Sequence, residues 1–269
     1  MSIAPEYVAA RRVLLDAAAA LGDHRDNLVL VGAQAVYHHT GDADVNVPLL
    51  TTDADFAVDT TDLQDAPEIG GLLRTAGFIP GPNPGHWVSI GDIAVDLMVV
   101  PHQAGTTRST ARAARLSPHE KLTARIARGL EPSLIDNTSV PVRALDPDDD
   151  REFTLRVAGP AALLTAKAVK INERLQQAER QPDRLHAKDA LDAFRLFQAI
   201  ETIDLVTGFA SHQADHEARA VSAEAIKIYR ENAASPDGAI PRLAASAAQG
   251  DPTIPPSFAA LVNALLSAI

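Results

Sequence analysis

The chain has 269 residues, of which 46% are hydrophobic and 22% charged, the balance of a globular protein with a substantial core. It contains no cysteine, so disulfides, thiolate nucleophiles and cysteine-ligated zinc sites are excluded together. The net charge of −11 argues against nucleic-acid binding over the whole surface. No apolar run approaches membrane-spanning length and no basic leader precedes an apolar core, so we expect a cytoplasmic protein with no membrane partner.

The N-terminal part of the chain alternates helix and strand patterns. Residues 7–21 have the spacing of a helix with one apolar face, and 28–31 is a short apolar run typical of a buried strand. Gly32 follows that strand, and a helix-like stretch continues over 36–39. A strand–glycine–helix turn places backbone N–H groups at a helix N-terminus, where they can face a phosphate. The turn lacks the glycine and lysine motifs of dinucleotide sites and P-loops, so neither is indicated.

Two acids, Asp53 and Asp55, begin a β-prone run two positions apart. On a strand, side chains two apart point to the same side, so the two carboxylates repel each other unless a cation lies between them. A hard divalent ion such as Mg²⁺ is the usual solution. The alternative is a turn or an exposed strand edge with two unrelated acids. A helix over 65–76 is predicted to follow.

A hairpin is predicted from residues 87–90 and 93–100, turning at Gly91 and Asp92. Asp96 is the only charged residue of the second strand. A buried, unpaired carboxylate is costly, so Asp96 is expected either at a surface or sharing a cation with other acids.

The stretch Arg108–Arg128, called the basic segment below, is cationic within an acidic chain. Its only acid is Glu120. Such a charge run is ordinarily the solvated face of a helix. The cationic residues of the basic segment are Arg108, Arg112, Arg115, Lys121, Arg125 and Arg128.

The composition changes near residue 158, after a predicted strand pair at 139–142 and 153–157, to alanine-rich helix. We therefore place a boundary there, dividing the chain into a strand-containing region over 1–158 and a helical region over 159–269. The helices predicted in the second region are 160–180, 185–200, 203–211, 214–231, 240–249 and 256–268.

The first two helices of this region carry a group of charged residues. Lys167 and Arg174 lie two turns apart on one helix face, with Lys170 beside them. Lys167 follows the otherwise apolar stretch 161–166, which makes it a candidate to contact a phosphate in a cleft. The alternative is a set of surface charges pairing along the helix. The next helix opens with Lys188, Asp189 and Asp192.

In this order the motifs resemble the nucleotidyltransferase superfamily, and within it the AbiEii/MenT-like toxins of bacterial toxin–antitoxin systems. The matching segments are Gly32-Ala33-Gln34-Ala35, Thr51-x-Asp53-x-Asp55, Val95-Asp96-Leu97, Lys167-x6-Arg174 and Lys188-Asp189-x2-Asp192. Two positions depart from the family pattern. Ala33 stands where the family usually has a second Gly or a Ser, and Pro48-Leu49-Leu50 offers no Arg before Thr51.

The resemblance implies an α+β fold, with a mixed-sheet, nucleotidyltransferase-like palm lobe over 1–158 and a helical lobe that binds nucleotide and substrate over 159–269. It implies that Mg²⁺, or Mn²⁺ in its place, is held by Asp53, Asp55 and Asp96. Lys167 and Asp189 complete the implied catalytic set. The residues it implies around the nucleotide are Gly32, Ala33, Thr51, Lys170, Arg174 and Lys188.

The implied activity is transfer of a nucleotide from an NTP to an RNA acceptor, the 3′ end of tRNA in the relatives, by a toxin with a cognate antitoxin as partner. The basic segment could then attract RNA locally, because potentials act over a Debye length of about 8 Å. Two alternatives remain open. One is transfer to a protein hydroxyl or a small molecule such as an aminoglycoside. The other, favoured by the two departures and the acidic charge, is a binding module of the same fold without catalysis.

Overall fold

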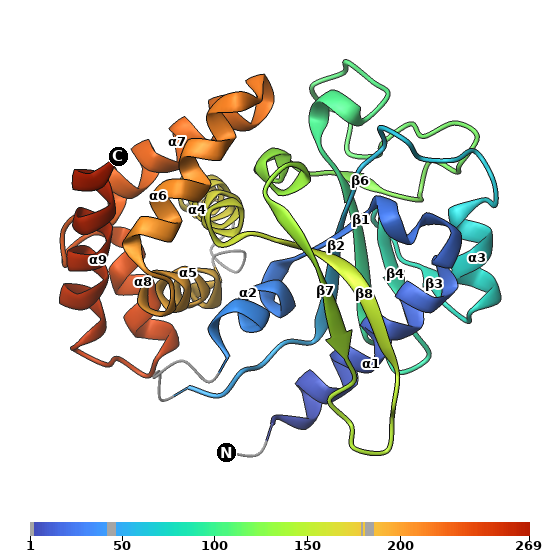
Figure 1. Cartoon of the computed structure of the whole chain (residues 1–269), viewed down its shortest axis with the longest axis horizontal. Helices are drawn as coiled ribbons and strands as arrows, with labels where there is room; N and C mark the ends of the chain where they lie inside the picture. The colour runs from blue at the N-terminus through green and yellow to red at the C-terminus, as the bar shows by residue number, and fades with distance from the viewer. Residues whose placement is uncertain (1–2, 42–46, 179, 181–185) are drawn as a thin grey trace. The chain divides into compact units, whose positions relative to one another are not determined.

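The computed structural model describes residues 3–41, 47–178, 180 and 186–269 (Figure 1). It is a mixed α/β protein, 51% helical and 15% strand, which confirms the predicted α+β class. The chain forms two compact units, which are described separately. The sheet unit comprises Met1–Ala35, Pro48–Arg128 and Asn137–Ala158, and the helical unit comprises Val36–Val47, Gly129–Asp136 and Gly159–Ile269.

The sheet unit is organised on one mixed sheet with strand order β3-β4-β5-β2-β1-β8-β7 and with β6 beside β5. Strands β2 and β5 run parallel, as do β1 and β8, whereas β4–β5 and β7–β8 are antiparallel. The predicted buried strand, the hairpin and the later strand pair are therefore confirmed. The strands are β1 Leu28–Val31, β2 Asp53–Val58, β3 Ile79–Pro80, β4 His86–Val88, β5 Ala94–Val99, β6 Arg125–Ile126, β7 Asn137–Arg143 and β8 Glu152–Ala158.

Helix α1 (Pro5–Ala20) packs on this sheet. It begins at a proline, whose fixed φ suits the first helical turn, and it buries Leu14 and Leu15 completely. Figure 1 shows α1 lying across the strands, in agreement with its contacts with β2 and β5. The helix thereby covers apolar side chains of both β2 and β5.

Helix α3 (Ile69–Thr75) is shorter than the helix predicted over 65–76. The prediction ignored Pro67, which disfavours helical backbone at the residue before it. Glu68 then caps the helix, because its carboxylate accepts hydrogen bonds from the backbone N–H groups of Gly70 and Gly71. The helix therefore begins directly after Glu68, whose carboxylate accepts from the N–H groups of its first turn.

The basic segment is not the helix face that its charge pattern predicted. It consists of irregular backbone and the short strand β6. Its two ends are joined, because Ala114 donates to the carbonyl of Ala124 at 3.0 Å and Ile126 donates to the carbonyl of Arg112 at 2.8 Å. Pro118 explains the absence of a helix, since it lacks an N–H and restricts the residue before it.

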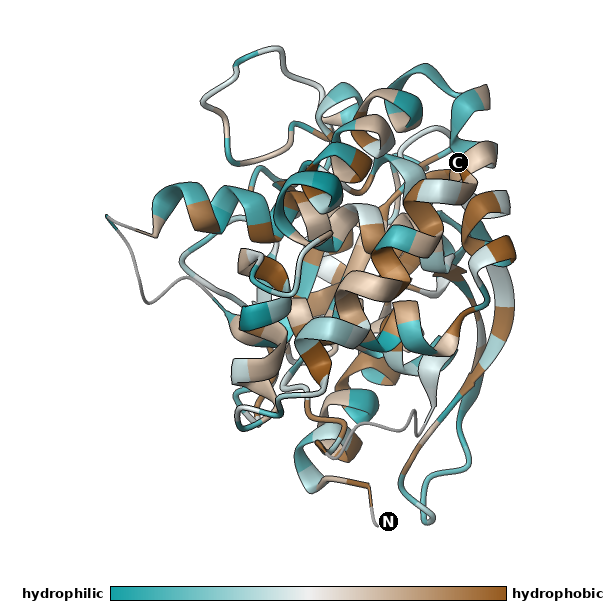
Figure 2. Cartoon of the chain, turned by 90° about the vertical axis from the view of Figure 1, so that its left-hand side faces the viewer, coloured by the Kyte–Doolittle hydropathy of each residue, from teal (hydrophilic) through white to brown (hydrophobic). Residues whose placement is uncertain are grey.

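The helical unit contains the helices predicted after residue 158. Residues 179 and 185, included in two of those predictions, lie outside the described residues. Phe197 packs against Tyr229 and Phe258, with ring centroids 5.2 and 5.6 Å apart. Figure 2 shows hydrophobic and hydrophilic residues alternating along these helices, as expected for helices that bury one face. The helices are α4 Pro160–Gln177, α5 Ala187–Ala199, α6 Thr202–Ser211, α7 His216–Asn232, α8 Ala239–Ala247 and α9 Ile254–Ala268.

Within the described residues, no helix has the length and apolar character needed to cross a membrane.

Candidate functional site

Asp53, Asp55 and Asp96, called the acidic row below, lie on two adjacent parallel strands. In the register of β2 with β5, Asp55 is directly opposite Asp96, and Asp53 is two residues earlier on the same side of β2. All three are partly exposed. The residues that alternate with them on the two strands are completely buried: Ala54, Phe56, Val95 and Leu97. The strand pattern therefore places three carboxylates on one side of the sheet, as the sequence predicted.

Asp53 is held by residues of the turn motif and of the preceding loop. The buried Thr51 hydroxyl donates to Asp53 Oδ1 at 2.7 Å. Gln34 Nε2 donates to the backbone carbonyl of Asp53 at 3.0 Å, and Gln34 Oε1 accepts from Arg11 Nε at 2.9 Å. Thr51, which the resemblance places around the nucleotide, fixes the direction of the Asp53 carboxylate. Gln34 ties the turn after β1 to the start of β2.

Gly32 begins helix α2 (Gly32–Thr40) with φ +69, in the left-handed region that favours glycine. A Cβ at this position would lie 2.0 Å from Asp55 Oδ2. The carboxylate of Asp55 therefore lies directly against the α-carbon of Gly32. Ala33, the departure from the family pattern, is only 6% exposed, so its methyl group packs inward.

Asp96 is bonded through both carboxylate oxygens. His86 Nδ1 lies 2.7 Å from Oδ1, and Arg125 Nη2 donates to Oδ2 at 3.1 Å. Neither partner was among the predicted site residues. His86 could have been found by counting back from the Gly91 turn, because the hairpin register places it opposite Asp96. Arg125 could not, since the two-residue strand that carries it has no sequence signal.

The donor types of the acidic row suit Mg²⁺, which prefers carboxylate oxygens. In the part of the chain that the structure describes, however, no three His, Asp or Glu side chains are grouped closely enough to hold a metal ion. Asp96 already has two partners. Its two partners come from β4 and β6, on the edge of β5 opposite to β2 and Asp55. A cation at Asp53 and Asp55 would therefore meet an Asp96 that is already ion-paired.

A second group of charges, called the cationic cluster below, joins α4 to α5 in the helical unit. Lys167 Nζ donates to Asp189 Oδ1 at 2.9 Å and to Asp192 Oδ2 at 2.6 Å, and these three side chains are buried. Asp189 also accepts from Lys170 at 3.1 Å and from Arg174 at 2.5 Å. Lys188, on the same turn as Asp189, lies with Nζ 5.9 Å from the ring centroid of Tyr37. The cluster consists of Lys167, Lys170, Arg174, Lys188, Asp189 and Asp192.

These contacts keep the central pair ionised. Burial alone would lower the pKa of Lys167, but the charges of Asp189 and Asp192 and their hydrogen bonds outweigh it and raise that pKa. For Asp189, burial would raise the pKa, and the charges of Lys167, Lys170 and Arg174 lower it instead. Lys167 is therefore a buried, charged link between two helices. The sequence made Lys167 a candidate phosphate contact, and the structure shows its ammonium bonded to two carboxylates that follow 22 and 25 residues later and were not assigned to it.

No family model, no curated protein and no solved structure matches this chain. The geometry of the acidic row and of the cationic cluster is therefore the basis for assigning a function.

The lowered pKa of Asp189 predicts an acid-dependent loss of stability. Its folded pKa lies below the ordinary value of 3.8, so its contribution is present above that pH and is lost as the pH falls further. We expect the free energy of unfolding to decrease between pH 5 and pH 3 by about 1 kcal/mol more in the wild type than in Asp189→Asn. Urea unfolding followed by circular dichroism at both pH values measures this difference. Equal decreases in the two proteins would contradict the lowered pKa of Asp189.

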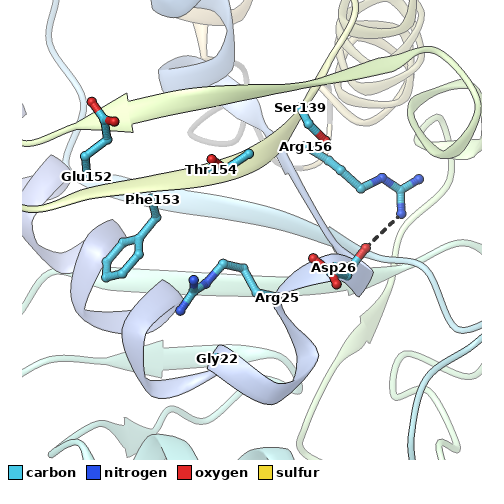
Figure 3. Close-up of a pocket in the computed structure, with 8 residues that line it drawn as sticks. All are labelled: Gly22, Arg25, Asp26, Ser139, Glu152, Phe153, Thr154 and Arg156. Atoms are coloured by element: carbon cyan, nitrogen blue, oxygen red, sulfur yellow. Dashed lines mark hydrogen bonds between the residues drawn. The ribbon is translucent and has the colours of Figure 1, made fainter.

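A cavity of about 430 Å³ lies elsewhere in the sheet unit, between the 3₁₀ turn η1 (Gly22–Asn27) and the β7–β8 hairpin (Figure 3). Arg25 lies beneath the ring of Phe153 at 4.4 Å from its centroid, and Arg156 Nη1 donates to the carbonyl of Asp26 at 3.1 Å. None of the predicted site residues contributes to its lining. The lining residues are Gly22, Arg25, Asp26, Ser139, Glu152, Phe153, Thr154 and Arg156.

Proposed function

We propose that the protein is a metal-dependent nucleotidyltransferase that moves a nucleotide from an NTP onto an RNA acceptor, the 3′ end of a tRNA by resemblance. By the same resemblance, we propose that it acts as the toxin of a toxin–antitoxin pair. The observation that carries the proposal is the register of β2 with β5, which sets Asp55 opposite Asp96 with Asp53 on the same side. Carboxylates are the ligands that divalent cations use in the chemistry of phosphates, and the register supports the proposal by putting these three on one side of the sheet.

When bound, Mg²⁺ or Mn²⁺ would neutralise the phosphates and polarise the bond between the α-phosphate and the leaving pyrophosphate. The chain's own residues have distinct tasks. Asp53 and Asp55 would hold the cation, with Thr51 fixing the direction of Asp53. A carboxylate of the row would accept the proton of the attacking hydroxyl. Gly32 lets the backbone approach Asp55 without the obstruction of a side chain.

The cationic cluster supports phosphate binding by the helical unit. Three cationic side chains, Lys167, Lys170 and Arg174, contact two carboxylates there, so these contacts leave an excess of positive charge within a chain of net charge −11. Because Lys167 is buried and Lys170 is 49% exposed, Lys170 is the better placed to meet a ligand. Lys167 would act by holding α4 and α5 together.

The basic segment supports RNA as the acceptor. Arg108, Arg112, Arg115 and Lys121 are exposed, and Glu120, the segment's only acid, is paired with Arg74 outside the segment. Phosphate contacts of this kind give affinity without sequence preference, and that affinity decreases as salt concentration increases.

Transfer of label from NTPs tests the proposal. Each NTP, labelled on the α-phosphate, is incubated with the protein and Mg²⁺ in the presence of total RNA, protein or an aminoglycoside. The proposal predicts label in RNA, and none when the label is on the γ-phosphate, because that phosphate leaves in pyrophosphate. Label in a protein or in the small molecule would replace RNA as the acceptor, whereas no label in any acceptor would contradict transferase activity.

A binding module without catalysis is the second candidate, and the ion pairs of Asp96 favour it. Both oxygens of the Asp96 carboxylate have partners, so the acidic row offers fewer oxygen ligands to a cation than the sequence predicted. Calorimetry separates the two candidates when no label is transferred. A binding module would bind an NTP without transferring it, whereas a protein with neither function would not bind an NTP.

A further inference from the structure

The cavity between η1 and the β7–β8 hairpin is lined by two side chains of opposite charge, Arg25 and Asp26, which follow each other on η1 (Figure 3). Arg25 is partly exposed and Asp26 is exposed, so solvent reaches both. In the part of the chain that the structure describes, neither the Nη nitrogens of Arg25 nor the carboxylate of Asp26 has a hydrogen-bond or ion-pair partner. The cavity therefore offers both a set of donors and a set of acceptors to a ligand.

The Arg25 guanidinium is held in place by two other contacts. Its Nε donates to the carbonyl of Ala18 at 3.1 Å, and its Cζ lies 4.4 Å from the centroid of the Phe153 ring. Figure 3 shows Phe153 extending from β8 toward Arg25. Because these contacts fix the side chain beforehand, an anion that binds to the Nη nitrogens costs less conformational entropy than binding to a mobile arginine would.

The other two charged residues of the lining already have partners of opposite charge. Glu152 is ion-paired with Arg143, and Arg156 Nη1 lies 3.3 Å from Asp59 Oδ2. Arg156 Nη1 also donates to the backbone carbonyl of Asp26 at 3.1 Å, which fixes the backbone of that residue beside the cavity. A ligand in the cavity therefore meets one cation and one anion that the described residues do not neutralise.

We propose that this cavity binds a free α-amino acid, with the ligand carboxylate on Arg25 and the ligand ammonium on Asp26. The planar guanidinium matches a carboxylate in shape and charge, and an ammonium donates well to a carboxylate. The charge of Asp26 disfavours a phosphate dianion on Arg25, whereas a zwitterion places its own cation there. The hydroxyls of Ser139 and Thr154, which also line the cavity, can bond the remaining polar groups of the ligand.

The size of the cavity suits such a ligand. Its volume of about 430 Å³ lies within the range of small-molecule sites and leaves room for an amino-acid side chain. The cavity shares no residue with the acidic row, the basic segment or the cationic cluster. The inference therefore goes beyond the proposed function and does not depend on it.

The first measurement is saturation-transfer difference NMR of the full chain with each standard amino acid at millimolar concentration, without NTP, RNA or metal. We expect at least one amino acid to bind. The analogue of that amino acid without its carboxylate should bind about tenfold or more weakly, and the analogue without its ammonium about two- to fivefold more weakly. Inorganic phosphate at the same concentration should not displace the amino acid.

The second measurement compares variants by NMR titration with the amino acid that binds. Arg25→Met should weaken binding about tenfold or more, because it removes the Nη donors. Asp26→Asn should weaken it about two- to fivefold, since an exposed ion pair contributes less. The matched control is Asp23→Asn, which removes an exposed charge of η1 outside the lining and should leave the affinity unchanged. Circular dichroism verifies that each variant is folded.

Three outcomes would overturn the inference. The first is that no amino acid binds to the wild type. The second is an affinity that is the same in Asp26→Asn as in Asp23→Asn, a comparison that holds even if Arg25→Met fails to fold. The third is that phosphate or the analogue without an ammonium binds as tightly as the amino acid, which would make the cavity a general anion site. None of these results bears on nucleotide transfer, because no NTP is present.

Discussion

Asp55→Asn is expected to lower the rate of nucleotide transfer by about 10²–10³-fold. Asp55 is the acid opposite Asp96 in the strand register, and its carboxylate lies against Gly32 at the start of α2. An amide of the same shape keeps the packing but removes the charge that would hold a cation. Initial rates of α-labelled NTP incorporation into RNA at saturating substrate measure the effect.

The matched control for this variant is Asp92→Asn. Asp92 is an exposed acid in the turn before β5, with φ 59, a conformation that asparagine also tolerates. The Asp92→Asn substitution removes one negative charge from the sheet unit, as Asp55→Asn does, and should leave the rate of nucleotide transfer unchanged. Retention of the wild-type rate by Asp55→Asn, or an equal loss in both variants, would show that the acidic row does not carry the reaction.

Lys167→Met is expected to lower the free energy of unfolding by about 3–5 kcal/mol. The substitution keeps the length of the buried side chain but removes the cation that bonds both Asp189 and Asp192. Asp189 would keep Lys170 and Arg174 as partners, whereas Asp192 would remain buried without the ammonium that it now accepts from. Urea unfolding followed by the helical circular-dichroism signal measures the change.

Lys170→Met is the control for that substitution. Lys170 also donates to Asp189, but its side chain is 49% exposed, so solvent screens the interaction and the expected loss is about 0–1 kcal/mol. Similar losses in the two variants would contradict the conclusion that burial of Lys167 makes the difference.

The parts of the fold with strong local patterns could be predicted from the sequence. The run 28–31 is apolar throughout and became a buried strand, and the Gly91-Asp92 turn fixed the hairpin that carries Asp96. The alanine-rich helices after residue 158 followed from their apolar spacing. In the site, alternation on a strand was enough to put Asp53 and Asp55 on one side.

The rest depended on contacts between distant residues. Arg125 reaches Asp96 from a strand of two residues, too short to show any periodicity. The basic segment, for which a helix face was expected, has irregular backbone around Pro118 and contains only this short strand. Lys167 follows an apolar stretch, which made it a candidate phosphate contact, but only the packing of α4 on α5 decides that its partners are Asp189 and Asp192.

The proposed function requires the acidic row to bind an NTP together with a divalent cation. The most direct measurement is calorimetric titration of the wild type and of Asp55→Asn with an NTP analogue that cannot be cleaved, with and without Mg²⁺. We expect the wild type to bind the analogue tightly only when Mg²⁺ is present, and Asp55→Asn to lose this dependence. Binding that is the same with and without Mg²⁺, in both proteins, would contradict it.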